Sequence, residues 1–433
     1  MEGYRFPNAH GGGPIERQPY GWLSRDGGVV RKWLDDMIAF VQHPLRMNAA
    51  LHPVILEFKA FIENDPAIYM GFHQMFEQVP YKPPFNKDPS GKSQVRSYMM
   101  MLRLFDHVIR TAPGYELGDY VGFPINAILL WPMATPAGMA MFMRQDVNDH
   151  FKKMFDVWSA FLTSEASRYV LNDQESGWFG PSASKAMPDF AETYICDPSA
   201  PYHGYSSWDD FFTRRFRPGV RPVVYPTADD IIISACESKV YRLAHGVKET
   251  DRFWLKEQPY SLAHMLNYDD YTSHFVGGTV YQAFLAATKY HRWHSPVRGT
   301  IVRTVMVPGT YYAESPCEGF PHPDPVGANL SQSFITSTAA RALIFIQAAN
   351  PDIGLMCLIG VGMAEVSTCE ITVKENDQVN KGDELGMFHF GGSTHCLLFR
   401  PQTKVTFSEG VIVDADIEVN APIASVSVAE GVP

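Results

Sequence analysis

The stretch "ALIFIQAANPDIGLMCLIGVG" (residues 342–362) decides the fold expected for the second half of the chain. It holds two aliphatic runs, 342–346 and 355–362, and each is long enough for a β-strand. Asn350-Pro351-Asp352 lies between them, and these residue types favour a turn. We therefore predict an antiparallel hairpin here. Other β-prone runs bounded by Gly, Pro or Asn predict further strands within 231–234, 300–307 and 371–390.

The residues before about 175 carry a helical pattern instead. In "FKKMFDVWSAFL" (151–162), Phe151, Phe155 and Trp158 recur at the spacing of one helix face. The segment "YMMMLRLFDHVI" (98–109) is apolar nearly all round, which predicts an internal helix. The simplest account of these apolar stripes is a hydrophobic core.

One segment, "VGFPINAILLWPMATPAGMAMFM" (121–143), approaches the length of a membrane span. Pro124, Pro132 and Pro136 divide it into apolar runs that are too short to cross a bilayer. We predict one or two buried helices and no stable membrane insertion, with a membrane span as the open alternative.

A region rich in proline and polar residues, roughly 173–206, separates the two halves. The stretch that follows, "SWDDFFTRRFRPGVRPV" (207–223), predicts a short helix that is capped by Ser207 and ends at Pro218-Gly219. The predicted fold class is α+β, with a helical N-terminal domain followed by an antiparallel β-rich domain. We place a flexible arm at 1–30, the helical domain at 31–205 and the β-rich domain at 206–433.

The composition is that of an ordinary globular protein, since 45% of the 433 residues are apolar and 19% are charged. The net charge of -11 argues against nucleic acid and an anionic membrane surface as partners. The six cysteines contain no C-x-x-C pair, so we expect buried reduced thiols and no zinc site. Residues 1–21 lack the apolar core of a signal peptide, and we expect a cytoplasmic protein.

Three clusters in the β-rich half carry residue types that fit one another. Ser393 follows two glycines in "GMFHFGGSTHCLLF" (386–399), where small residues interrupt an otherwise good strand. With His294 as a base and Glu237 as an orienting carboxylate, Ser393 has the composition of a nucleophilic triad. A second histidine, His291, lies three residues before His294, so an ideal strand would direct the two rings to opposite faces.

The same residues also admit less specific interpretations. The glycines are typical of a turn, two histidines in a strand are commonly structural, and most glutamates are solvated. A serine hydrolase that uses Ser393 without chain cleavage is one alternative, although Gly391–His395 is not a G-x-S-x-G motif. A non-catalytic binding protein is another.

Four motifs resemble, in order, those of the phosphatidylserine decarboxylase family. "GDELGMFHFGGST" (382–394) is similar to its processing motif, and "YHRWHSPVRGTI" (290–301) to its Tyr-His-Arg-x-His-x-Pro signature. "WDDFFTRRFRPGVRP" (208–222) resembles its Phe-Phe-x-Arg segment, and "ISACESKV" (233–240) takes the place of Ser-Pro-Ala-Asp-Gly-Lys-Val. Together the motifs cover about 207–410, roughly half of the chain.

The resemblance implies that the chain cuts itself between Gly392 and Ser393. The serine hydroxyl would attack the preceding carbonyl, with His294 as the general base and Glu237 holding that base. A glycine on the acyl side suits this attack because it is small and easily contorted. The resulting large chain, 1–392, and small chain, 393–433, would stay associated.

The family's cofactor is also implied by the resemblance. Ser393 would become a covalently bound pyruvoyl group that serves in place of pyridoxal phosphate, and neither pyridoxal phosphate nor a metal is expected. His291 is the expected proton donor to the substrate. The family places a Val-Gly loop beside the pyruvoyl group, and the matching residues 360–368 suggest Met363 and Thr368 as pocket residues.

The chain departs from the family pattern at two points. Glu237 replaces an aspartate, which makes its orienting role less secure, and Ser238 replaces a glycine. The long helical domain, with "VPGTYYAES" (307–315) and "MAEVSTCE" (363–370), is similar to fungal members that act on free L-tryptophan. The resemblance implies decarboxylation of a free aromatic L-amino acid, foremost L-tryptophan to tryptamine and CO2. Phosphatidylserine as the substrate is the alternative.

Overall fold

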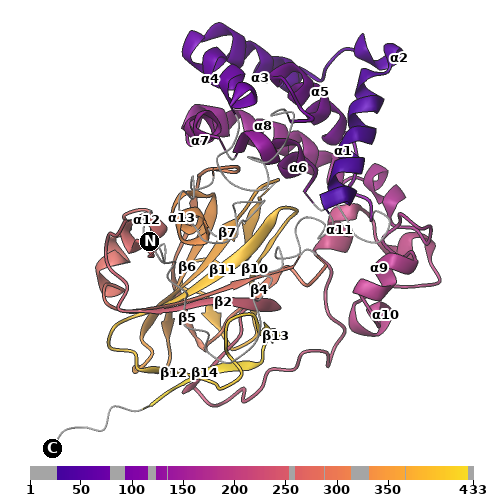
Figure 1. Ribbon diagram of the computed structural model, residues 1–433. Helices are drawn as coiled ribbons and strands as arrows, with labels where there is room; N and C mark the ends of the chain where they lie inside the picture. Colours follow the sequence, from indigo (N-terminus) through magenta and orange to yellow (C-terminus); the bar gives the residue numbers. More distant parts are fainter. Residues whose placement is uncertain are drawn as a thin grey trace, which may run out of the picture.

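Helices dominate the N-terminal part of the computed structural model and antiparallel strands its C-terminal part, which confirms the α+β class (Figure 1). Residues 27–30 of the predicted arm already belong to helix α1 (Gly27–Gln42). The domain boundaries stay predictions. The structure describes residues 27–78, 93–115, 123–133, 135–252, 259–286, 288–313, 331–365 and 367–427.

Two helices bear out the apolar patterns of the first half. Helix α8 (Gln145–Leu162) buries Phe151 and Trp158 on the predicted face. Helix α5 (Tyr98–Val108) is internal, as predicted, and Ser97 caps it by accepting a hydrogen bond from the Met100 N–H at 3.2 Å. Burial of one apolar face is the main force that holds such helices in place.

The segment 121–143 forms two buried helices, α6 (Pro124–Met133) and α7 (Pro136–Phe142). Each begins with a proline, a residue that fits the first turn because its missing N–H would have had no partner there. Within the described residues, no helix is long and apolar enough to cross a membrane.

Shorter helices complete this part of the chain and flank the sheets. They are α2 (Pro44–Met47), α3 (Pro53–Asn64), α4 (Pro66–Glu77), η2 (Glu165–Val170), α9 (Pro181–Ala186), α10 (Phe190–Thr193), η3 (Pro201–Gly204), α12 (Leu262–Met265), η4 (Asp270–His274) and α13 (Gln332–Thr338).

Helix α11 (Trp208–Phe212) has the predicted cap, because the Ser207 hydroxyl accepts a hydrogen bond from the Asp210 N–H at 3.0 Å. The prediction that this helix runs to Pro218-Gly219 was wrong. The chain after α11 pairs with residues 193–195 instead, where the Ile195 N–H donates to the Arg215 carbonyl at 2.8 Å. This pairing satisfies backbone groups that a longer helix would have used.

The predicted hairpin is present, because β6 (Arg341–Ala348) and β7 (Leu355–Gly362) pair antiparallel. They belong to an eight-stranded antiparallel sheet in which β7 lies next to the strand that carries Ser393. The sheet order is β13 (Asp416–Ile417), β2 (Ser238–His245), β3 (Thr279–Phe284), β11 (Gly392–Phe399), β7, β6, β5 (Gly299–Val307) and β9 (Gln378–Val379).

Two three-stranded antiparallel sheets pack near the large one. The first contains β4 (Arg292–His294), β10 (Glu384–Phe388) and β8 (Cys369–Ile371). The second contains β1 (Ile231–Ile233), β14 (Pro422–Val426) and β12 (Val405–Phe407). The predicted strands within 371–390 exist, but β9 and β10 join different sheets.

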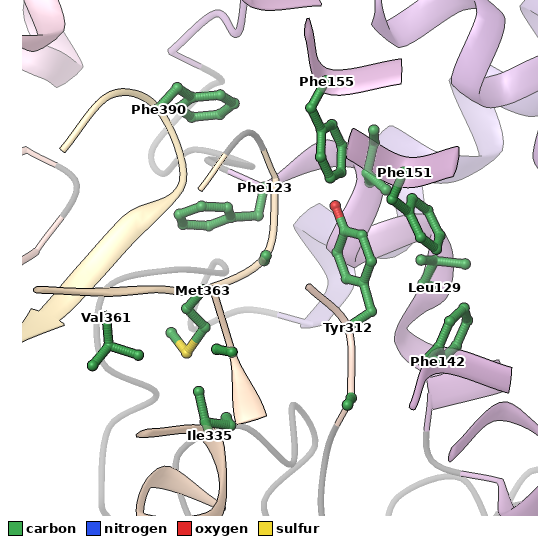
Figure 2. Packing of buried hydrophobic residues seen from close by; sticks show 14 of the residues in the cluster. Phe123, Leu129, Phe142, Phe151, Phe155, Tyr312, Ile335, Val361, Met363 and Phe390 are labelled. Atoms are coloured by element: carbon green, nitrogen blue, oxygen red, sulfur yellow. The ribbon is translucent and has the colours of Figure 1, made fainter. Parts of the chain in front are cut away.

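A single hydrophobic core joins the helical part to the large sheet. The Trp158 ring meets Phe390 at 5.2 Å between centroids, and Phe151 meets Tyr312 at 5.1 Å. Figure 2 shows Phe123 lying parallel to Phe390, which follows β10, with their centroids 5.6 Å apart. The helices therefore contribute directly to the surroundings of the segment that leads to Ser393.

The described cysteines are free thiols, and most of them are buried. Burial raises the pKa of the Cys369 thiol to about 12, so this sulfur behaves as a small apolar group. Cys317 lies outside the described residues. The free thiols are Cys196, Cys236, Cys357, Cys369 and Cys396.

Candidate active site

The predicted cleavage site lies at the start of β11, between β3 and β7 of the large sheet. Gly392 pairs with Gly362, and Thr394 pairs with Val361, the residue next to Gly362. Ser393 is therefore the extra residue of a β-bulge. A bulge bends the strand and interrupts its regular pairing, which distinguishes this peptide from the rest of β11.

The backbone just before the bulge is held by the loop that follows β7. The Gly391 carbonyl accepts hydrogen bonds from the Met363 N–H and the Ser367 hydroxyl, both at 3.0 Å. The Ser367 N–H donates to the Phe390 carbonyl at 3.0 Å. Gly391 itself has φ of +95°, a conformation that favours glycine. Small residues at this point therefore serve a backbone geometry that a regular strand does not have.

The loop after β7 is strained. Ala364, Glu365 and Ser367 have φ values of +56°, +31° and +45°. Residues other than glycine rarely adopt such values. Backbone strain of this kind costs about 1–3 kcal/mol for each residue and concentrates at functional sites. The surrounding contacts must hold the loop in this form.

A small cavity opens beside this loop, between the two parts of the molecule. Met363 and Ala364 from the loop, Asn126 and Met133 from α6, and Tyr312 contribute to its wall. Its space is about that of one water molecule. In Figure 2, Met363 lies between Phe123 and Ile335. The helical part thus forms one side of the cavity.

The two predicted pocket residues lie in different surroundings. Met363 lines the cavity and is 6% exposed. Thr368 is exposed and is not among the described residues that line it. The Thr368 carbonyl accepts a hydrogen bond from the His389 N–H at 2.9 Å, so Thr368 contacts the processing segment through its backbone.

His291 is buried beside the strand that leads to Ser393. Its carbonyl accepts a hydrogen bond from the Phe388 N–H at 2.9 Å, and its ring stacks on Phe212 at 3.9 Å. Within the described residues, neither ring nitrogen has a hydrogen-bond partner. Burial lowers the pKa of His291 well below its usual value, so the ring is neutral at pH 7. A buried imidazole without partners can bind a polar group of a ligand or exchange a proton with it.

His294 has a different environment from His291. Its Nδ1 lies 2.6 Å from the Gly382 carbonyl, and its Nε2 lies 2.8 Å from the Tyr290 hydroxyl. A carbonyl only accepts hydrogen bonds, so Nδ1 carries the proton and Nε2 accepts one from Tyr290. Burial lowers the pKa of His294, which keeps the ring neutral and able to act as a base.

Glu237 is a buried carboxylate that lies immediately before β2. It forms an ion pair with Arg221 at 2.7 Å and accepts a hydrogen bond from the Val419 N–H at 2.9 Å. The His294 N–H donates to the Ala235 carbonyl at 2.8 Å, which brings the backbones of the two segments together. Within the described residues, no hydrogen bond joins the Glu237 side chain to the His294 ring.

Two titratable groups beside the site did not emerge from the sequence. His389 bonds to Asp209 and Glu370, and burial raises the pKa of Glu365 to about 8. The Asn126 N–H donates to the Glu365 carboxyl at 2.9 Å. His389 lies within the processing motif, but its carboxylate partners are 180 and 19 residues away in sequence. No local spacing predicts such contacts.

A buried polar network lies on the other side of the cleavage point. The Gln282 amide donates to the Thr394 hydroxyl at 3.0 Å and accepts from the Tyr260 hydroxyl at 2.5 Å. Next to Thr394, His395 is fully buried, and burial lowers its pKa to about 4. These contacts hold the strand after Ser393, as the loop after β7 holds the residues before it.

Comparison with known proteins shows to which family this chain belongs. Two protein-family models, both described as phosphatidylserine decarboxylase, match this sequence. One matches residues 52–187 and the other matches residues 208–421. An L-tryptophan decarboxylase of Psilocybe cubensis is 41% identical over 409 residues, which cover 90% of each chain. The chain belongs to the phosphatidylserine decarboxylase family. This confirms the resemblance that the four motifs indicated, and the chain is a decarboxylase, that is, a carboxy-lyase.

Two further relatives support the same assignment. An L-tryptophan decarboxylase of Psilocybe cyanescens is 41% identical over 427 residues, 94% of each chain. A decarboxylase of Amanita muscaria is 44% identical over 334 residues, which cover 74% of this chain and 95% of that protein. The similarity to the Psilocybe enzymes therefore includes the helical part as well as the sheets.

The phosphatidylserine decarboxylase family uses a pyruvoyl group made from a serine of its own chain. The described residues fit such a group, because Ser393 occupies a bulge after two glycines and His291 offers two buried ring nitrogens without partners. No cluster of His, Cys, Asp and Glu that could hold a metal ion occurs in the described part of the chain.

Proposed function

We propose that this protein cleaves itself between Gly392 and Ser393 and then decarboxylates a free aromatic L-amino acid, foremost L-tryptophan, to its amine. The similarity to two L-tryptophan decarboxylases over 90% or more of each chain carries this proposal. The bulge at Ser393 and the glycine conformation at Gly391 support cleavage at this bond, since both interrupt the regular strand geometry at this point.

In the cleavage step, the Ser393 hydroxyl attacks the Gly392 carbonyl while His294 takes its proton, and the Gly392–Ser393 C–N bond breaks to leave an ester. β-Elimination then releases the Gly392 carboxylate, and water hydrolyses the dehydroalanine left at position 393, with loss of ammonia, to the pyruvoyl group. The Gly382 carbonyl orients the His294 ring through Nδ1, so Nε2 is the basic atom, and the Tyr290 hydroxyl must release Nε2 before it takes the proton. Glu237 holds the segment against which His294 lies, through Arg221 and the Val419 N–H. The new small chain stays bound because β11 lies between two other strands of the sheet.

In the decarboxylation step, a pyruvoyl group held at position 393 would supply the electron sink that loss of CO2 needs. His291 returns a proton to the substrate carbon. Met363 lines the cavity and donates its N–H to the Gly391 carbonyl, and Thr368 holds the processing segment through its own carbonyl. Neither pyridoxal phosphate nor a metal is required for these steps.

The cavity is lined mostly by apolar side chains and enclosed on one side by α6, and an apolar lining is compatible with an aromatic side chain. A phosphatidylserine decarboxylase is the second candidate, because both matching family models carry that description. The two candidates share the self-cleavage and differ in the size and solubility of the substrate. The cytoplasmic location inferred from the sequence also stays a prediction.

Mass spectrometry of the purified protein tests the cleavage, and incubation with L-tryptophan or with phosphatidylserine liposomes tests the substrate. We expect two chains in place of one of 48.6 kDa, a blocked small chain that begins at residue 393, and tryptamine release. The Ser393→Ala variant should stay intact. An intact wild-type chain whose Ser393 reacts with a serine-hydrolase probe would favour the hydrolase alternative, and amine release from the lipid alone would contradict the choice of substrate.

A further inference from the structure

His389 joins three elements at a point four residues before Ser393. Its Nδ1 lies 2.9 and 3.0 Å from the two carboxylate oxygens of Asp209, on α11. Its Nε2 lies 2.9 Å from the carboxylate of Glu370, on β8. The ring belongs to the connection between β10 and β11, so one side chain links the processing segment to helix α11 and to β8, the strand that pairs with β10.

The bridge is an ion pair on both sides of the ring. Ionised carboxylates only accept hydrogen bonds, so both ring nitrogens must carry protons to bond to them. Burial alone would lower the pKa of His389, but Asp209 and Glu370 outweigh it and raise that pKa to about 9. These two carboxylates are the charged groups that face the ring, one from α11 and one from β8.

The bridge adjoins a tightly packed side chain. Phe390 follows His389 and stacks on Phe123, while Trp158 and Trp208 approach it at 5.2 and 4.7 Å between centroids. The next residue, Gly391, has a positive φ, and the β-bulge at Ser393 follows it. The segment before the scissile bond is therefore anchored by charge at His389 and by packing at Phe390.

We propose that His389 is a positioning residue for self-cleavage, whose bridge to Asp209 and Glu370 holds the backbone of 389–391 so that the Gly392 carbonyl stays within reach of Ser393. The inference rests on the proposed function and extends it to a residue that does not touch the reacting atoms. Its physical basis is that a shift of about 1 Å in a reacting group can slow a reaction about 100-fold.

The test follows cleavage of the full chain after cell-free synthesis, by denaturing gel electrophoresis over time. His389→Gln removes the charge, His389→Lys keeps it, and His274→Gln, on an exposed helix turn, is the matched control. We expect cleavage about 10- to 100-fold slower for His389→Gln, at most a few-fold slower for His389→Lys, and unchanged for His274→Gln. Melting temperatures in a Ser393→Ala background report whether each variant folds.

The dependence on pH separates positioning by charge from a general structural effect. The His389 cation is fully present below about pH 6.5 and is lost as the pH rises through about 9. Cleavage of the wild type should therefore fall relative to His389→Lys above pH 9. Should His389→Gln fail to fold, this ratio decides the matter, and a ratio that stays constant with pH would overturn the inference.

Failure of the inference differs from failure of the proposed function. A wild-type chain that stays uncut under all conditions overturns both. A wild type that cuts itself, together with a folded His389→Gln variant that cuts at the same rate, overturns only the role of His389.

Discussion

The carboxyl group of Glu365 accepts a hydrogen bond from the backbone N–H of Asn126 at 2.9 Å, and the two residues are 239 positions apart in the sequence. Asn126 lies in the first turn of α6, where N–H groups lack partners within the helix. The hydroxyl of Tyr312 lies 3.5 Å from the other oxygen. A residue of the strained loop beside Gly391 thus caps a helix of the other part of the molecule.

The first prediction concerns the protonation of Glu365. Burial raises its pKa from 4.5 to about 8, so the folded protein holds this proton more tightly than the unfolded chain. Stability should therefore fall as the pH rises from about 4.5 to 8, and the effect should be complete above pH 8. The glutamine in Glu365→Gln is neutral at every pH. The melting temperature of this variant should therefore rise relative to that of the wild type as the pH increases across this range.

Melting temperatures of the wild type, Glu365→Gln and the exposed control Glu375→Gln, measured at pH 5, 6.5 and 8, test this prediction. By pH 8 the free energy of unfolding of Glu365→Gln should exceed that of the wild type by a few kcal/mol. The control should follow the wild type throughout. A constant difference between Glu365→Gln and the wild type would contradict the prediction.

The second prediction separates the roles of the two histidines. His294→Asn should leave the chain uncut because the general base is lost, whereas His291→Asn should cut itself normally. His291→Asn should then release product about 100-fold more slowly, the usual effect of removing a general acid. Gel electrophoresis reports the first effect, and amine release reports the second. Normal cleavage of the His294→Asn variant would show that His294 is not the general base.

The pH dependence of cleavage adds a check on His294. Burial lowers the pKa of His294 below its usual value, so the ring is neutral at pH 7 and above. The cleavage rate should therefore be constant from pH 7 to 8 and fall at lower pH, as the base becomes protonated. A rate that still rises between pH 7 and 8 would indicate a different base.

The third prediction concerns Glu237 and Arg221. Glu237→Gln breaks a largely buried ion pair and should lower the free energy of unfolding by about 2 kcal/mol. Cleavage should slow only a few-fold, because the Gly382 carbonyl still orients His294. Arg221→Gln is the matched variant and should show the same pattern. Complete loss of cleavage in a stable Glu237→Gln protein would instead assign Glu237 a direct part in activating His294.

Local patterns in the sequence predicted the elements but not their long-range contacts. The face of α8, the cap at Ser207 and the hairpin of β6 and β7 each depend on residues close together in the chain. The pairing of β9 with β5 and of β10 with β4 depends on residues far apart, and no periodicity encodes it.

The candidate site follows the same division. The motifs identified Ser393, His294 and His291 because family signatures preserve their spacing. The partners of Glu237 and the acids around His389 come from distant segments, and only the folded chain brings them together. The strained loop also escaped prediction, since Ala364 and Glu365 have no intrinsic preference for positive φ.

The last prediction concerns the admission of the substrate. The cavity between the described residues has room for about one water molecule, so we expect its wall to move when an aromatic amino acid enters. Met363 is suited to this movement because its side chain is unbranched and adopts several rotamers. Met363→Ile is branched at Cβ and stiff, so it should raise KM for L-tryptophan about tenfold and leave kcat little changed.

Met306→Ile is the matched control, because Met306 is 51% exposed on β5 and does not line the cavity defined by the described residues. Both variants should cut themselves at the rate of the wild type and lose less than about 1.5 kcal/mol of stability, since the exchange nearly conserves volume. Steady-state amine release over a range of L-tryptophan concentrations measures KM and kcat. Equal KM values for Met363→Ile, Met306→Ile and the wild type would show that the substrate enters without passing Met363.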